Sequence, residues 1–293
     1  MIEDIINMIF SGILNGAVIS LIALGYSLVY GVGGIMNLAH GAYFMLTGYL
    51  LLYGMPIFSG FLFLSVIIAV VTVTIIGGLT YILLIKPLQD SHVGVVLITF
   101  GLAFAIEQFV LIISGTTSET ISDYIIFTGT TEILGYSMAN QFIFFIIISL
   151  VIVSLFALFI SKSKLGKSIR AVSQDREAAV LMGINANRVL LYTVMISAFL
   201  AAVGASLYLP GAALSGPSMA WTYLTSSFAV IILGGMGSLV GSVVGGYIVG
   251  FITSFTSVFI PNGPSWAHIV PLIVIVIVLI IRPQGLFGKK KIE

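Results

Sequence analysis

Residues 31–43 read GVGGIMNLAHGAY, and they interrupt a stretch without Asp, Glu, Lys or Arg that runs from Ile5 to Ile85. A second stretch without these residues runs from Val189 to Ile281. One bilayer crossing needs about 20 apolar residues, so each stretch has room for several crossings. The glycine and polar residues of 31–43 therefore fall where a chain inside lipid is expected to stay apolar and helical.

The composition of the chain is that of a membrane protein. Of its 293 residues, 59% are hydrophobic and 7% are charged, whereas a soluble domain carries about 25% charged residues. Within lipid every backbone N–H and C=O must be paired inside the segment, and long continuous apolar runs satisfy this as helices. We therefore expect an all-α polytopic membrane protein with a single transmembrane domain over residues 1–293.

The apolar runs predict eight or nine transmembrane helices, because glycine or polar residues interrupt the second, seventh and eighth candidates. The nine candidate spans cover residues 8–30, 36–54, 57–85, 93–113, 139–161, 189–210, 219–235, 239–260 and 267–282.

The basic residues predict the orientation, since Lys and Arg flank spans on the cytoplasmic side. Successive loops between spans lie on alternate sides of the membrane, which divides the loops into two sets. All 11 basic residues fall in one set: Lys86, six residues within 162–188, and Arg282 with Lys289–Lys291. The other set holds only acids, which are Glu3, Asp4, Glu119, Asp123 and Glu132. We expect the N-terminus outside and the C-terminus in the cytoplasm. The acidic N-terminal residues also predict no cleaved secretory signal.

Two loops are long enough to carry function. The outer loop, residues 114–138, is rich in Thr and Ser, and it is either a solvated connector or part of a docking face. The inner loop, residues 162–188, lacks proline and glycine between Ser168 and Gly183, so we expect one short helix there that stops at Gly183. Apolar residues at 178–182 make this helix either an interfacial element or a contact surface.

The sequence Gly166-Lys167-Ser168 in the inner loop is the same as the last three positions of a phosphate-binding P-loop motif. That motif requires a glycine five residues before Gly166, where this chain has Ser161, and a strand before it. We therefore expect no ATP site in this chain, so that any energy source lies on another subunit or in an ion gradient.

The interruption at 31–43 offers candidate residues for a solute path. Asn37 and His40 are three residues apart and share a helix face, followed by Gly41. Irregular backbone at membrane depth is tolerated against protein or a water-filled cavity, so these residues are either polar links between helices or part of a translocation path. Glu107, the acid within a predicted span, is either functional or hydrogen-bonded to a neighbouring helix.

Glycines recur late in the chain, in GGMGSLVGSVVGGYIVG at residues 234–250. Gly237, Gly241 and Gly245 are spaced by four, a pattern that lets helices pack backbone to backbone. Interrupted spans near the start and the end of a chain also suggest a pseudo-symmetric transporter with a central path, and both interpretations can hold together.

At this point the residues resemble the membrane permease of branched-chain amino-acid ABC importers, of the LivH-like type. The run NLAHG at residues 37–41, the Glu177-Ala178-Ala179-x₃-Gly183 pattern and the run LGGMGSLVGSVVGG at residues 233–246 carry the resemblance, which extends over nearly the whole chain.

This resemblance implies a multi-pass transport subunit of a prokaryotic plasma (inner) membrane, not an enzyme. It implies a second permease subunit, two cytoplasmic ATP-binding subunits and an extracytoplasmic solute-binding protein as partners, with ATP as the cofactor of those partners and no nucleic acid. It also implies that the inner loop couples to an ATPase through Arg170, Glu177, Ala178, Ala179 and Gly183. Related permeases leave urea, short amides and other amino acids open as solutes.

Two other classes remain for comparison. One is a proton-coupled secondary transporter in which Glu107 and His40 relay protons; a single intramembrane acid is a weak basis for it. The other is an intramembrane enzyme, but His40, His92 and His268 are scattered along the chain. The absence of cysteine excludes disulfides and thiolate metal sites, and we expect no metal.

Overall fold

The computed structural model describes residues 2–58, 61–121, 125–267 and 269–288, so Asp123, His268 and Lys289–Lys291 lie outside the described residues. The helices are α1 (Ile2–Gly33), α2 (His40–Ile57), α3 (Leu62–Thr80), α4 (Lys86–Leu88), α5 (His92–Ser114), α6 (Asn140–Lys162), α7 (Lys164–Gln174), α8 (Arg176–Leu181), α9 (Ala186–Tyr208), α10 (Met219–Gly234), α11 (Leu239–Phe259), α12 (Gly263–Trp266) and α13 (Ile269–Ile281). A π-helical turn, Tyr81–Ile85, joins α3 to α4.

The all-α polytopic class is confirmed, and every predicted span corresponds to a helix. In the part of the chain that the structure describes, six helical stretches are long and apolar enough to cross a membrane: Ile2–Gly33, Leu62–Leu88, His92–Ser114, Asn140–Lys162, Ala186–Gly211 and Leu239–Phe259. Helices α10 and α13 are apolar but shorter, and α2 is also outside the set of six. Together with the shorter helices α2, α10 and α13, these stretches account for the nine predicted spans.

Short strands occupy the connections. Strands β2 (Thr130–Ile133) and β3 (Tyr136–Ala139) form an antiparallel hairpin in the predicted outer loop. Strand β1 (Glu119–Thr120) pairs with β4 (Ala213–Leu214), which ties this loop to the segment before α10. The hairpin lies beside the start of α1, where the Phe10 and Tyr136 rings stack with centroids 5.6 Å apart.

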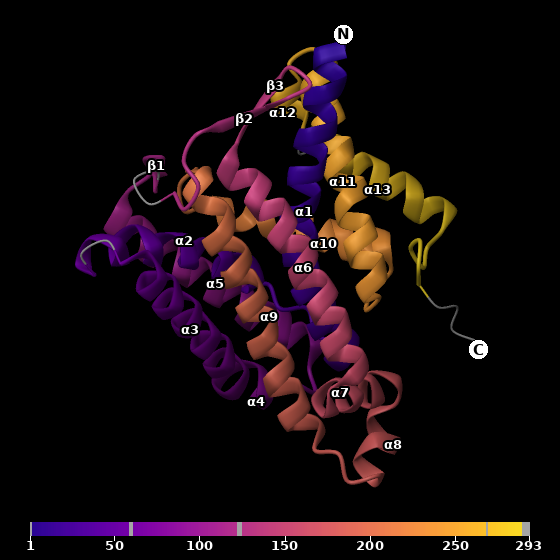
Figure 1. Cartoon of the computed structure of the whole chain (residues 1–293). Coiled ribbons are helices and arrows are strands. Elements are labelled where there is room, and N and C mark those ends of the chain that lie inside the picture. Colours follow the sequence, from indigo (N-terminus) through magenta and orange to yellow (C-terminus); the bar gives the residue numbers. More distant parts are fainter. Residues whose placement is uncertain (1, 59–60, 122–124, 268, 289–293) are drawn as a thin grey trace.

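The two ends of the helical bundle differ in charge. The N-terminus, the strands β1–β3 and α12 lie at one end, and α4, α7 and α8 lie at the other (Figure 1). Arg176 at the start of α8 links two of the basic loops, because its guanidinium donates to the side-chain oxygens of Gln89 at 3.4 Å and Asn187 at 3.2 Å. We call the end that carries α4, α7 and α8 the basic end.

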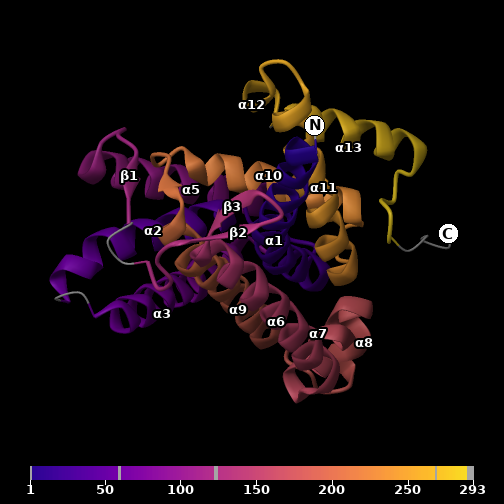
Figure 2. The same ribbon diagram turned by 45° about the horizontal axis from the view of Figure 1, so that its top comes forward.

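Helix α1 forms the centre of the bundle and is buried along most of residues 16–29. It packs against α6, α9, α10 and α11 (Figure 2). Its contact with α11 is close because small residues face one another: a methyl group on Gly250 would lie 2.5 Å from the Gly16 Cα, and one on Gly246 would lie 2.7 Å from the Ser20 Cα. Helices approach this closely in membranes where glycine removes the side chain.

The chain contains two halves with matching neighbours. In the first half α2 packs against α3, α5 and α9; in the second half α10 packs against α11, α13 and α1. Likewise α1 packs against α11, and α9 packs against α3. Each contact of the first half has a counterpart in the second half if α1, α2, α3 and α5 are matched, in this order, with α9, α10, α11 and α13. Helix α1 starts at the end of the bundle opposite the basic end, whereas α9 starts at the basic end, so the two halves run in opposite directions (Figure 1). This is the arrangement of an inverted repeat, which in transporters places interrupted helices at the centre.

The pseudo-symmetry was predicted, but the position of the second interruption was wrong. The non-helical segment that matches 34–39 is the one before α10, with a 3₁₀ turn at Leu209–Gly211 and strand β4, and not the glycine run 234–250. The glycine run makes the turn between α10 and α11 and then continues as regular helix. The reason is that glycines spaced by four let α11 pack closely without breaking its helix.

Candidate functional site

The first interruption brings non-helical backbone into the interior of the bundle. Helix α1 ends at Gly33, and Gly34 has a positive φ of 63° that turns the chain back. The Leu38 N–H then donates to the Thr99 hydroxyl of α5 at 3.1 Å. The Ala39 N–H donates to the Asn37 side-chain oxygen, also at 3.1 Å. Side chains therefore replace the helical hydrogen bonds that this segment lacks.

His40 begins α2 and is fully buried. Its Nε2 lies 2.8 Å from the Ile22 carbonyl oxygen of α1, and its Nδ1 lies 3.1 Å from the Ser197 hydroxyl of α9. A carbonyl only accepts, so Nε2 carries the proton and donates, while in the neutral ring Nδ1 accepts from Ser197. Both ring nitrogens are thus used to hold α2 against its two neighbours.

Gly41 lies where the first turns of α2 and α10 meet. A methyl group added at Gly41 would overlap the Ala220 carbonyl oxygen and would lie 2.7 Å from the Leu224 Cβ. Both helices therefore start inside the bundle, side by side, and only glycine permits this separation.

Glu107 contacts the same region from α5. Its side chain is 9% exposed, and it accepts a hydrogen bond from the indole nitrogen of Trp221 in the first turn of α10. The ring of Phe100, also on α5, lies 5.2 Å from the Trp221 ring. The structure thus brings Asn37, His40, Gly41 and Glu107 to the interior ends of α2 and α10, where protein groups surround them.

Two cavities lie along α10, separate from its contact with Gly41 of α2. The first has a volume of about 290 Å³ and is bounded by α10, α11, Ala267 and the first turn of α13 at Pro271 and Leu272. The second, about 200 Å³, lies between α1, α9, α10 and α11. Both cavities are lined by Thr222, Ser226 and Thr253.

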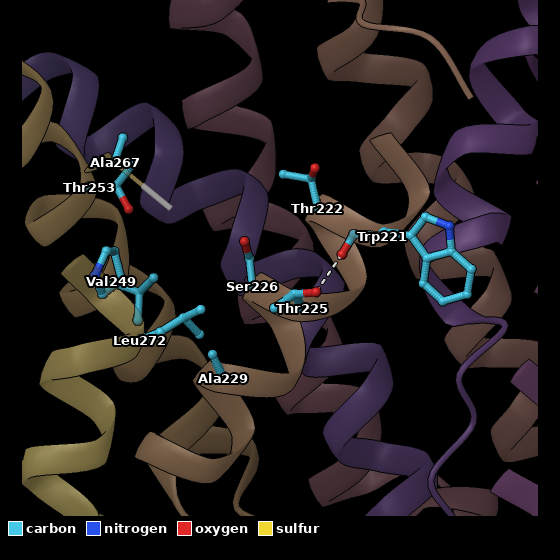
Figure 3. A pocket seen from close by; sticks show the side chains of 10 residues that line it. Trp221, Thr222, Thr225, Ser226, Ala229, Val249, Thr253, Ala267 and Leu272 are labelled. Atoms are coloured by element: carbon cyan, nitrogen blue, oxygen red, sulfur yellow. Dashed lines mark hydrogen bonds between the residues drawn. The ribbon is translucent and has the colours of Figure 1, made fainter. Parts of the chain in front are cut away.

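The described residues that line these cavities are uncharged and rich in hydroxyl groups. In the first cavity Thr222, Thr225 and Ser226 face Val249 and Leu272, whereas the Trp221 indole is directed away from them (Figure 3). Asn15 and Tyr223 add polar groups to the second cavity. Such a surface offers a small solute weak hydrogen bonds together with apolar contacts.

The sequence prediction missed these hydroxyl-bearing residues. The signal was present: Thr222, Thr225, Ser226 and Ala229 recur at the spacing of one helix face. It was overlooked because the glycine run that follows was given the role of the second interruption.

The inner loop forms two helices where one was predicted. Helix α7 begins after Ser163, whose hydroxyl accepts from the Gly166 N–H at 2.8 Å. It stops at Asp175, whose carboxylate accepts from the Ala178 N–H at 2.9 Å and so starts α8. An aspartate favours such a cap over a position inside a helix, which explains the break.

The predicted stop at Gly183 is confirmed. Gly183 has a φ of 84°, its N–H donates to the Val180 carbonyl, and the Ile184 N–H donates to the Ala179 carbonyl. These bonds form the Schellman motif that closes a helix with a left-handed glycine.

Helix α8 presents apolar side chains at the far tip of the basic end. Leu181 and Met182 are 87% and 83% exposed, and Glu177 and Ala178 beside them are exposed as well. Ala179 is buried against the bundle. Arg170 lies on α7, where its guanidinium donates to the Ile160 carbonyl at the end of α6. The residues of the predicted coupling set therefore divide between the tip of α8 and the base of the loop.

The late glycines also divide between two positions. Gly237 lies in the turn before α11, against Gly31, with a φ of 83°. Gly241 and Gly245 lie on α11 facing α10: a methyl group on Gly241 would overlap the Gly234 carbonyl oxygen, and one on Gly245 would lie 3.1 Å from the Val230 carbonyl oxygen.

Helices interrupted inside the bundle, two inverted halves and cavities whose described lining is uncharged are typical of a membrane transport protein. The chain belongs to the family described as branched-chain amino acid transport system / permease component, whose model matches residues 8–279.

Curated relatives cover almost the same length. The chain is 27% identical over 304 residues to the high-affinity branched-chain amino acid transport system permease protein LivH of Escherichia coli (strain K12), covering 98% of this chain and 97% of the relative. It is 26% identical over 301 residues to the permease protein BraD of Pseudomonas aeruginosa, with the same coverage of the two chains. A probable LivH of Methanocaldococcus jannaschii is 28% identical over 296 residues, covering 94% of this chain and 92% of the relative. No solved structure matches the chain.

Proposed function

We propose that this chain is the membrane-spanning permease subunit of an ATP-driven importer for branched-chain amino acids. The observation that carries the proposal is the family match across residues 8–279, supported by relatives that are named as permease proteins of branched-chain amino acid transport systems. These relatives are transport subunits rather than enzymes. ATP is then bound by partner subunits, in keeping with Ser161 at the position where a P-loop needs glycine.

The proposed assembly contains a second permease, two ATP-binding subunits and an extracytoplasmic solute-binding protein. The basic end faces the cytoplasm, because Lys and Arg concentrate on that side of bacterial membrane proteins. The N-terminus and the strands β1–β3 then face the solute-binding protein, and the C-terminus lies in the cytoplasm.

The proposed contact with an ATPase is the tip of α8. Leu181 and Met182 protrude beyond the bundle with Glu177 and Ala178 beside them, so a groove on a partner can bury them. Asp175 and Gly183 fix the two ends of the helix, which makes it a rigid element able to transmit force. Ala179 and Arg170 anchor it to the bundle.

The proposed translocation path follows the hydroxyl-lined face of α10. Among the residues that the structure describes, the cavity lining carries no charged side chain, which suits a zwitterionic solute of zero net charge with an aliphatic side chain. Asn37, His40 and Gly41 serve the path by fixing the ends of α2 and α10, and Glu107 does so through Trp221.

Transport by the reconstituted assembly tests the proposal. Proteoliposomes that contain the permeases and ATPases, with the solute-binding protein outside, should accumulate leucine, isoleucine or valine when ATP is supplied, and a protonophore should leave uptake unchanged. Uptake of urea or a short amide, but not of leucine, would reassign the solute. Uptake that needs no ATPase and collapses with the protonophore would replace the importer with a secondary transporter.

A further inference from the structure

An apolar groove outside the translocation region runs along the surface of the bundle near the basic end. Its volume is about 380 Å³, and it lies between α6 and α11 with Leu24 of α1 also in its lining. The α6 wall includes Phe156 and Ala157, and the α11 wall includes Val240 and Val243. The two cavities along α10 share no lining residue with this groove.

One end of this groove is cationic. Arg170 is the charged residue of the lining, and its one described hydrogen bond, to the Ile160 carbonyl, leaves other guanidinium N–H groups able to donate. Residues 162–174 contain Lys162, Lys164, Lys167 and Arg170 and no acid. The three lysines and Arg170 are all exposed. An anion at this end of the groove would therefore meet the Arg170 guanidinium, in a segment that carries three further cations and no acid.

The surroundings of the groove indicate its occupant. In the lining itself, Ala157 on α6 is exposed, and Val240 and Val244 on α11 are 65% and 37% exposed, so the groove opens on the surface that faces hydrocarbon. The cations lie at the end of α6, where a membrane-spanning helix meets the headgroup layer. A molecule that fits has an apolar chain and an anionic head. Basic pockets between transmembrane helices are known to bind anionic lipid headgroups in this way.

We propose that the groove between α6 and α11 binds one anionic phospholipid of the membrane leaflet at the basic end. Its acyl chain lies against Ala157 and Val243, and Arg170 donates to its phosphate. The site stabilises the junction of α6 with α7, at the base of the α7–α8 element. It does not depend on which solute the chain carries.

Lipid retention by the purified full-length chain tests the groove. Native mass spectrometry in detergent with added phosphatidylglycerol should detect one tightly retained lipid. Ala157→Trp fills the groove and should abolish retention, whereas Ala105→Trp, at an exposed alanine on α5, should not. Equal retention by the two variants would overturn the site.

A second comparison tests the headgroup. Arg170→Gln should weaken phosphatidylglycerol retention by about fivefold, the effect of one basic contact with an anionic lipid. Arg176→Gln removes a cation at the same end, outside the groove, and should leave retention unchanged. Retention of phosphatidylcholine equal to that of phosphatidylglycerol would overturn the recognition of charge, and so would competition by inorganic phosphate alone.

The alternative occupant is the second permease subunit. The chain has no cysteine, so Ala157→Cys supplies a unique thiol in the groove. In the assembled transporter this thiol should react with a membrane-permeant maleimide at the same rate as in the isolated chain. Protection of the thiol on assembly would assign the groove to the subunit interface and overturn the lipid proposal.

Discussion

Glu107 on α5 accepts a hydrogen bond from the indole nitrogen of Trp221 on α10, and this bond joins the two inverted halves of the chain. A second link does the same on the other side of α2, where His40 bonds to both Ile22 of α1 and Ser197 of α9. The halves are thus connected by polar contacts next to the starts of α2 and α10. If α10 moves relative to the first half, these hydrogen bonds must either break or their partners must move together with α10.

The first prediction concerns the Glu107–Trp221 pair. Glu107→Leu and Trp221→Phe should each lower the free energy of unfolding by about 1–3 kcal/mol, because Glu107 is buried and Trp221 half-buried and each change leaves one of them without its partner. The double variant should lose less than the sum of the single losses. Unfolding by SDS in mixed micelles measures all three, and strictly additive losses would show that the bond contributes nothing.

The second prediction compares two glycines of neighbouring helices. Gly41→Ala adds a methyl group that overlaps the Ala220 carbonyl, so it should separate α2 from α10 and lower both stability and transport. At Gly101 on α5, no described atom outside its own helical turn lies within 4 Å of an added methyl group, so Gly101→Ala should be neutral or stabilising by up to about 1 kcal/mol. Thermal unfolding measures the stability of each variant, and uptake assays measure its transport. Equal stability and uptake of the two variants would contradict the close approach of α2 to α10.

These elements show what the sequence could and could not predict. The long apolar runs, the basic loops and the stop at Gly183 were predictable, because each depends on local chemistry: hydropathy, charge count and a left-handed glycine. The interruption at 31–43 was also predictable, since glycines and polar residues mark it within an apolar run.

The partners of the interrupted segments could not be predicted. His40 bonds to Ser197 across 157 positions, and Glu107 bonds to Trp221 across 114, so both pairs depend on how distant helices pack. The second interruption was assigned to the glycine run because glycine frees the backbone and is unfavourable inside a helix. In a bundle the same glycines allow α11 to pack closely on α1 and α10 while remaining helical.

The third prediction concerns the cavity along α10. Ser226→Trp should fill the space that Ser226 shares with Thr222 and Thr253, and it should reduce uptake by at least about tenfold while assembly with the ATPases persists. Ser154→Trp, at an exposed serine on α6, should leave uptake near that of the unchanged chain. Full uptake by Ser226→Trp would place the translocation path elsewhere.

The last prediction concerns the α8 tip, where an apolar surface is exposed on an element that lies beyond the bundle. Leu181→Asp places a charge in the proposed contact, so it should weaken ATPase binding by about 2 kcal/mol or more and abolish ATP-dependent uptake. The fold should persist, because the side chain is 87% exposed and supports nothing else in the bundle. Leu134→Asp provides the matched control, since Leu134 is 78% exposed in the β2–β3 hairpin at the opposite end. Detergent pull-down of the ATPase with each variant gives the comparison. If Leu181→Asp retains as much ATPase as Leu134→Asp, the ATPase must bind the chain at another surface.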